Sequence, residues 1–109
     1  MVKLLVGHKG TGKTKLMVEM ANRDVNEKNG SVVFISKDDR LKHDLEHQIR
    51  MIVMDDFEYV NNIDEYIGFI YGIMSSNYDI EVIFIDSILR HADIAIRDLP
   101  EFLRRLQVI

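Results

Sequence analysis

The chain has 109 residues, of which 47% are hydrophobic and 29% charged, and its formal net charge is −4. This is the composition of one ordinary globular domain over residues 1–109, and it gives no general attraction to nucleic acid. The lack of cysteine excludes disulfides and thiolate metal sites. The sequence has no run of membrane-spanning length and no secretory signal, so we expect a cytoplasmic protein.

The first element that the sequence predicts is a short apolar strand over residues 2–6, with no domain before it. Residues 7–14 follow directly, read Gly-His-Lys-Gly-Thr-Gly-Lys-Thr and fit the Walker A pattern G-x-x-x-x-G-K-[ST] without a mismatch. A helical pattern begins at Lys13. In such a strand–loop–helix unit, the loop N–H groups and the positive end of the helix can bind a phosphate together.

Each residue type in this loop suits the binding of a triphosphate. Gly10 and Gly12 permit backbone angles and close approaches that a Cβ would prevent. Lys13 is expected to neutralise the β- and γ-phosphates, and the hydroxyl of Thr14 is expected to ligate Mg²⁺. The predicted nucleotide-binding residues are Gly7, His8, Lys9, Gly10, Thr11, Gly12, Lys13 and Thr14.

Strand and helix patterns alternate in the next part of the chain. The first helix is expected to end near Gly30, which suits a left-handed cap. Residues 31–36 form a continuous β-branched and aromatic run, typical of a strand that is covered on both faces. Apolar residues at every fourth position from Leu41 to Ile49 predict a short amphipathic helix. Residues 51–54 predict a third strand.

A longer helix is predicted from Asn62, which forms a capping-box pattern with Glu65. Its apolar face consists of Ile63, Tyr66, Ile67, Ile70, Tyr71 and Met74. Gly68 and Gly72 lie one turn apart on this helix, so we expect another element to pack closely against them. This element order continues the alternation of strands and helices.

Residues 81–86 predict a fourth strand, and the stretch from Asp98 predicts a short final helix with proline in its first turn. Alternating strands and helices of this kind form an α/β fold. We therefore predict three layers, α/β/α, around a mostly parallel sheet.

A Mg²⁺-bound triphosphate needs a second acid at the tip of a neighbouring strand, which is the Walker B position. Asp86 directly follows the apolar residues Val82 to Ile85 and is the preferred candidate. Asp55 and Asp56, which follow the third strand, are the alternative. A plain role in a turn explains those two acids better.

With this loop and Asp86, the chain resembles the P-loop NTPases, in particular the RecA-like or thymidine-kinase-like branch. The resemblance implies Mg²⁺-dependent binding of a nucleoside triphosphate, with ATP as the expected nucleotide. Many such ATPases place a glutamate after the Walker B acid, whereas this chain has Ser87, so we expect slow hydrolysis. RecA-like enzymes take an acid from the end of the neighbouring strand, which makes Asp38 and Asp39 candidate catalytic residues beside Lys13.

The resemblance also bears on assembly, because RecA-like sheets insert a further strand between the Walker A and Walker B strands. A chain that ends at Ile109 leaves that slot empty, unless it is truncated, completed by a second copy, or pairs the two strands directly. Since native proteins avoid unpaired strand edges, we expect a homo-oligomer. Two alternative functions stay open: a nucleotide-binding regulatory or assembly protein without significant turnover, and a small-molecule kinase.

Other patterns support weaker functional hypotheses. Residues 43–47 match H-x-x-E-H, the spacing of inverted zincin metalloproteases, but no third zinc ligand forms a motif. A solvated polar face is therefore the favoured interpretation. Arg40, Arg90 and Arg97 are candidates for a charge sensor or an arginine finger, although a surface charge explains each of them better. The tyrosines are not interleaved with basic residues, so a stacking platform for single-stranded nucleic acid is not indicated.

Overall fold

The structure is a computed structural model that describes residues 3–6, 13–27, 30–57, 59–60, 62–86, 100–101 and 104, with residues 3–6 and 13 described through their backbone. The element order is β1 (Lys3–Val6), α1 (Lys13–Glu27), β2 (Ser31–Ser36), β3 (Arg50–Val53), the 3₁₀ turn η1 (Met54–Asp56), α2 (Ile63–Ser76) and β4 (Ile80–Ile85). Pro100, Glu101 and Arg104 are helical too, within the predicted final helix, whose predicted start at Asp98 lies outside the described residues. None of the described helices is long and apolar enough to cross a membrane.

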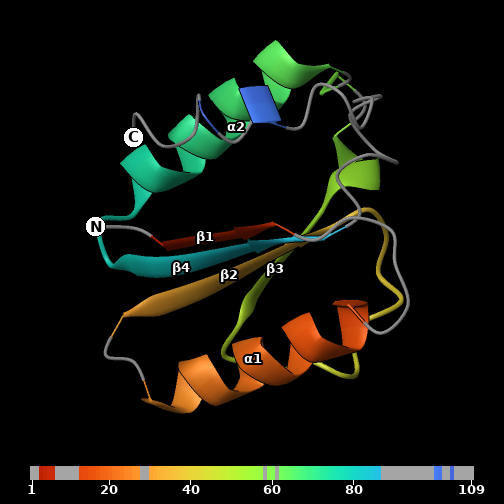
Figure 1. Ribbon diagram of the computed structural model, residues 1–109, viewed down its shortest axis with the longest axis vertical. Helices are drawn as coiled ribbons and strands as arrows, with labels where there is room; N and C mark the ends of the chain where they lie inside the picture. The colour runs from red at the N-terminus through yellow and green to blue at the C-terminus, as the bar shows by residue number, and fades with distance from the viewer. Residues whose placement is uncertain are drawn as a thin grey trace.

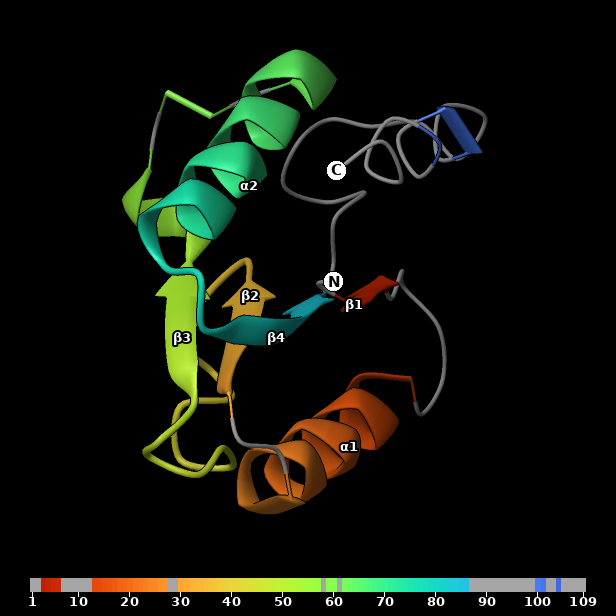
Figure 2. The same cartoon turned by 90° about the vertical axis from the view of Figure 1, so that its left-hand side faces the viewer.

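A four-stranded sheet forms the middle layer, with the strand order β1-β4-β2-β3 (Figure 1). All three pairings between these strands are parallel. Helix α1 covers one face of the sheet and α2 covers the other, as the two perpendicular views show (Figures 1 and 2). The prediction of an α/β fold with a parallel sheet is therefore confirmed. Parallel strands need such crossover connections, and the helices in them cover the sheet.

The two central strands, β2 and β4, carry most of the core. One cluster of buried side chains lies between the sheet and α2, and includes Tyr66 and Ile70. A second lies between the sheet and α1, where the rings of Phe34 and Phe84 stack with their centroids 5.8 Å apart. Because both faces of these strands are covered, each contains an unbroken apolar run, residues 32–35 in β2 and residues 82–85 in β4. For β2, the sequence predicted this cover on both faces.

Strands β1 and β4 are direct neighbours, with Leu5 opposite Phe84 in the register. No strand is inserted between them, so the arrangement differs from the expected RecA-like order and matches the third account, direct pairing. Their facing N–H and C=O groups are satisfied by each other. The empty slot on which the expectation of a homo-oligomer depended is therefore not present between these two strands, and self-association stays a prediction without that support.

Residues 41–49 form successive turns, so the prediction of a helix there is wrong. Three backbone amides in this segment donate to carbonyls three residues earlier. The side chain of Asn22 on α1 donates to the Asp44 carbonyl oxygen at 2.9 Å and accepts the Glu46 amide at 2.8 Å. Ile49 is buried, as its spacing suggested. The apolar pattern thus predicted burial correctly, but these contacts with α1 hold the backbone in turns.

Helix α2 begins as predicted, because the Asn62 Oδ1 accepts the Glu65 amide at 2.9 Å. Its buried residues are Tyr66, Ile67, Ile70 and Ile73. Tyr71 was expected on this face, but it lies at the edge of the buried stripe, and 37% of its surface is exposed. A methyl group at Gly68 or Gly72 would meet no described atom within 4 Å, so the close packing predicted there is not found in the described part of the chain.

Gly30 lies at a close contact between two chain segments. The prediction of a left-handed helix cap at this residue is wrong, because its φ lies outside the left-handed region. A Cβ at this position would collide with the carbonyl oxygen of Asp79 and with the side chain of Glu81. The adjacent Ser31 amide donates to the same Asp79 oxygen at 2.7 Å. Glycine is required because the start of β2 lies against the turn before β4.

We predict that Gly30→Ala lowers the free energy of unfolding by about 1–3 kcal/mol, the usual cost of inserting a group into filled space. Urea denaturation of the two proteins measures it. Gly68→Ala is the matched control, because the space there is open and alanine favours a helix interior by about 1 kcal/mol over glycine. A Gly30→Ala protein as stable as the parent would contradict this account of the turn.

Candidate functional site

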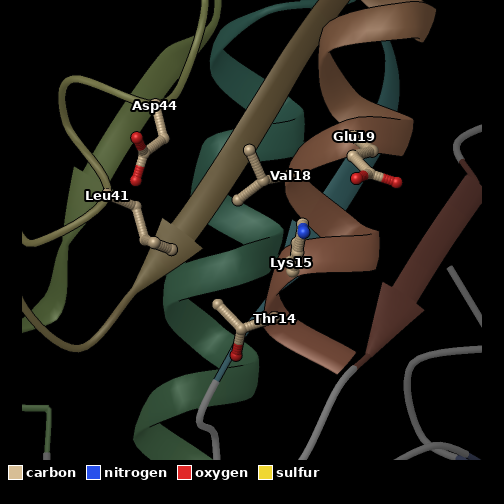
Figure 3. A pocket seen from close by; sticks show the side chains of 6 residues that line it. All are labelled: Thr14, Lys15, Val18, Glu19, Leu41 and Asp44. Carbon is tan, nitrogen blue, oxygen red and sulfur yellow. The ribbon is translucent and has the colours of Figure 1, made fainter. Parts of the chain in front are cut away.

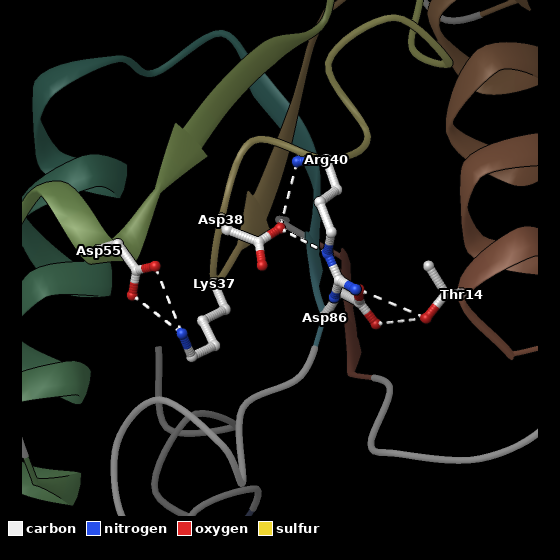
Figure 4. Close-up of polar contacts among 6 residues, drawn as sticks. All are labelled: Thr14, Lys37, Asp38, Arg40, Asp55 and Asp86. Carbon is white, nitrogen blue, oxygen red and sulfur yellow. Dashed lines mark hydrogen bonds and ion pairs between the residues drawn. The ribbon is translucent and has the colours of Figure 1, made fainter.

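Thr14 and Asp86 meet at the carboxyl edge of the sheet, although 72 residues separate them in the chain (Figure 4). The Thr14 hydroxyl donates to Asp86 Oδ1 at 3.1 Å and lies 3.4 Å from Oδ2. Thr14 belongs to the first turn of α1, and Asp86 directly follows β4. The structure thus brings together the two residues that were predicted to ligate Mg²⁺.

The sheet explains why these two side chains meet. Val6 at the end of β1 lies opposite Ile85 at the end of β4, so the start of α1 and the end of β4 reach the same edge. The backbone amide of Asp86 donates to the Ile35 carbonyl oxygen at 2.8 Å, which fixes Asp86 against β2 as well. The carboxyl edge of a parallel sheet is where α/β proteins bind their ligands.

Asp86 is buried, with 6% of its surface exposed. A buried carboxylate is costly unless hydrogen bonds or a cation compensate its charge, and the Thr14 hydroxyl supplies one such bond. Tyr66 of α2 is also buried, and burial, followed by the negative charge of Asp86, raises the pKa of its phenol above the usual value. The electrostatic influence of Asp86 therefore reaches the helix on the other side of the sheet.

A hydroxyl and a carboxylate offer the hard oxygen ligands that Mg²⁺ prefers. The described residues contain no group of three or more His, Cys, Asp or Glu side chains that could hold a metal ion by themselves. Mg²⁺ commonly binds through one or two protein oxygens and completes its shell with water and substrate phosphates. The Thr14–Asp86 pair fits a metal that arrives with a phosphate ligand.

Most of the predicted phosphate loop lies outside the described residues, namely Gly7, His8, Lys9, Gly10, Thr11 and Gly12. Lys13 is the first residue of α1 and is described through its backbone. The first turn of α1 carries no acidic residue, so its positive end has no negative side chain of its own to repel an anion. The roles of the loop residues and of the Lys13 side chain stay predictions.

Asp38 and Asp39, the candidate catalytic acids, lie in the turn that follows β2. Asp38 Oδ1 accepts the backbone N–H of Arg40 at 3.1 Å and its Nε–H at 3.0 Å (Figure 4). These contacts, the backbone bond first, hold the pKa of Asp38 below its usual value. A lowered pKa makes a carboxylate a weaker general base. Asp38 is therefore poorly suited to act as a catalytic base, and Asp39 is a solvent-exposed residue of the same turn.

The alternative metal acids occupy a different place. Asp55, in η1, pairs with Lys37 at 3.3 Å, and both side chains are partly exposed (Figure 4). Asp56 is also exposed. Strand β3, which leads into η1, is separated from β4 by β2, so these acids follow a strand that does not adjoin the Asp86 strand. Asp55 is thus a surface ion-pair partner, as its role in a turn suggested.

The remaining sequence hypotheses find no support in the described residues. His43 and His47 are both exposed and lie in turns, so they lack the helical face on which the zincin pattern depends. Arg40 forms an ion pair with Asp38, and most of the Arg40 side chain is exposed to solvent. Arg90, Arg97 and the residue after the Walker B acid, Ser87, lie outside the described residues.

A pocket that sequence reasoning missed lies beside Thr14, with a volume of about 530 Å³ (Figure 3). It lies between the first two turns of α1 and the segment after β2. Its lining residues are Thr14, Lys15, Val18, Glu19, Leu41 and Asp44. No periodic signal could have predicted it, because its outer wall is made by turns where the sequence pattern indicated a helix.

Comparisons of this chain with protein-family models, with curated proteins and with solved structures found no match. No family is therefore assigned from similarity. The resemblance to P-loop NTPases stays a prediction from the Walker A pattern and the position of Asp86 in the sequence.

We predict that Thr14→Val destabilises the fold by about 1.5–3 kcal/mol, because a buried carboxylate loses a hydrogen-bond donor without a change in side-chain shape. Thr14→Ser keeps the hydroxyl and is expected to recover most of this loss. Urea denaturation of the three proteins provides the measurement. Equal stability of the valine and serine variants would show that the hydrogen bond contributes nothing.

The raised pKa of Tyr66 predicts how stability depends on pH. Because the phenol holds its proton more tightly in the folded state, the free energy of unfolding should fall as pH rises above about 10, the pKa of an unfolded tyrosine. Tyr66→Phe should remove this part of the pH dependence. In an absorbance titration at alkaline pH, the parent should show a late-ionising phenol that the variant lacks. Identical titration curves would contradict the burial of Tyr66 next to a negative charge.

Proposed function

We propose that this protein binds a nucleoside triphosphate together with Mg²⁺, with ATP as the expected nucleotide, and hydrolyses it slowly. The observation that carries the proposal is the 3.1 Å contact between the Thr14 hydroxyl and Asp86. Thr14 closes the Walker A pattern, and Asp86 ends the strand beside the one that enters this pattern. A chance match to the Walker A pattern would not require its last residue to touch an acid 72 positions away.

Each residue then has a role that its chemistry supports. The loop amides of residues 7–12 and the Lys13 ammonium would hold the phosphates. Thr14 and Asp86 would hold Mg²⁺, which when bound offsets the negative charge of the β- and γ-phosphates. Thr14 is anchored by the first turn of α1, and Asp86 by the hydrogen bond that its backbone N–H donates to the Ile35 carbonyl oxygen. Both groups are therefore positioned before a ligand arrives.

Slow turnover follows from the acids that surround this site. Hydrolysis needs a group that orients or deprotonates the attacking water. The lowered pKa of Asp38 and its two bonds to Arg40 make it a poor base, and the sequence places Ser87 after Asp86. These features equally favour the first alternative, a nucleotide-binding regulatory protein in which turnover is incidental.

The pocket beside Thr14 favours a further candidate function, a small-molecule kinase. Such an enzyme must hold a second molecule next to the terminal phosphate, and the pocket provides about 530 Å³ of space beside Thr14, the proposed metal ligand. Turnover that rises when an acceptor is supplied would distinguish this function from simple hydrolysis. Unchanged turnover with every acceptor tested would favour the ATPase or the regulatory protein.

We predict that Lys13→Ala weakens ATP binding at least tenfold, or by about 1.4 kcal/mol, because it removes a positive charge that is expected to contact the β- and γ-phosphates. Calorimetric titration of ATP with Mg²⁺ measures the effect. Lys42→Ala, which removes an exposed lysine from the segment after β2, serves as the control for a general loss of positive charge.

Asp86→Asn extends this test to the metal. Its ATP affinity should fall in Mg²⁺ but match the parent in EDTA, because the acid acts through the ion. If the Lys13→Ala protein binds ATP as tightly as the parent, the proposed function is wrong.

A further inference from the structure

The pocket beside Thr14 is open to solvent on one side and has an apolar floor. Val18 is 9% exposed and packs into the core, while Leu41 is partly buried and faces it from the segment after β2 (Figure 3). The volume of about 530 Å³ lies within the range of roughly 300–1,000 Å³ that is usual for small-molecule sites. The space therefore suits a compact molecule with an apolar body.

The outer wall of the pocket is held in place by α1 itself. Asn22 uses both atoms of its amide, since Nδ2 donates to the Asp44 carbonyl oxygen and Oδ1 accepts the Glu46 amide. The backbone amide of Asp44 also donates to the Leu41 carbonyl oxygen at 2.9 Å. The two residues that form the wall are thus tied to each other and to the helix that forms the floor. Such a preformed wall lowers the entropic cost of binding.

The charges at the rim are unequal. Among the described lining residues, Glu19 and Asp44 contribute two carboxylates and Lys15 contributes one ammonium, so this part of the rim has an excess of one negative charge. All three side chains are exposed, and no ion pair within the described part of the chain engages Glu19 or Asp44. These carboxylates are available to a positively charged ligand, whereas an anionic ligand would meet a repulsive field.

We infer that this pocket binds a small organic amine whose apolar body lies on Val18 and Leu41 and whose ammonium group is attracted by the negative charges of the rim, Glu19 and Asp44. Thr14 lines the pocket and also contacts Asp86, so the amine would lie beside the proposed metal site. That position relative to a nucleotide rests on the proposed function, whereas binding of the amine does not. The site would admit a second substrate or an effector that senses the bound nucleotide.

The test uses three probes of similar shape on the full chain: phenethylamine, its neutral counterpart 2-phenylethanol, and the anion phenylacetate. Titrations followed by NMR should shift the signals of Val18 and Leu41. The amine should bind about tenfold more tightly than the anion, with the alcohol in between, because the three probes are similar in shape and differ mainly in charge. Equal affinities, or shifts that lie elsewhere on the protein, would overturn the inference.

Matched variants show whether the rim acids are responsible. Glu19→Gln and Asp44→Asn should each reduce the preference for the amine over the alcohol by about threefold. Glu27→Gln removes an exposed acid from the same helix outside the pocket, and it should leave the preference unchanged. A loss of equal size in all three variants would indicate a general charge effect and would overturn the site.

Calorimetry with Mg²⁺ and ATP separates the two proposals. If ATP binds and phenethylamine does not, the pocket inference is wrong while the proposed function survives. If phenethylamine binds as expected and ATP does not, the pocket is a ligand site and the proposed nucleotide function is wrong. If both bind, linkage requires that each ligand change the affinity of the other by the same factor.

Discussion

The hydrogen bonds that join β1 to β4 place the start of α1 next to the end of β4, and the candidate site depends on this one pairing. With Val6 opposite Ile85, Thr14 and Asp86 lie at the same edge of the sheet and contact each other. In this sheet the ends of the two strands are one strand spacing apart, about 5 Å. The contact between hydroxyl and carboxylate is therefore a consequence of strand order.

The core supports the site from both faces of the sheet. Strands β2 and β4 are buried between α1 and α2, so the backbone that carries Asp86 is held by β1 on one side and β2 on the other. Because Asp86 is buried, its carboxylate needs a hydrogen-bond donor or a cation beside it. Thr14 provides one, and Tyr66 on α2 lies close enough to sense its charge. A cation bound with a phosphate would be a stronger partner than either.

The segment between β2 and β3 shows how tertiary contacts create a feature that no motif announces. Apolar spacing there agrees with a helix, but Asn22 replaces backbone hydrogen bonds of a helix with its own side-chain amide. The segment therefore folds as turns against α1, and the space left between them is the pocket beside Thr14. The Asn22 contacts that replace a helix with turns thus also position Asp44, a charged residue, in the wall of the pocket. If ATP and an amine both bind, Thr14 is the residue that connects their sites.

The apolar runs of β2 and β4 and the Asn62 cap could be read from the chain, because each depends on neighbours a few residues away. The direct pairing of β1 with β4, the close contact at Gly30, the exposure of Tyr71 and the turns over residues 41–49 could not. Each of these depends on a partner far away in the sequence, and local pattern contains no information about which distant groups meet. The sequence alone therefore determined the α/β class and the residue types of the proposed nucleotide site. Only the tertiary structure decided that Thr14 touches Asp86, because strand order is a property of the whole sheet.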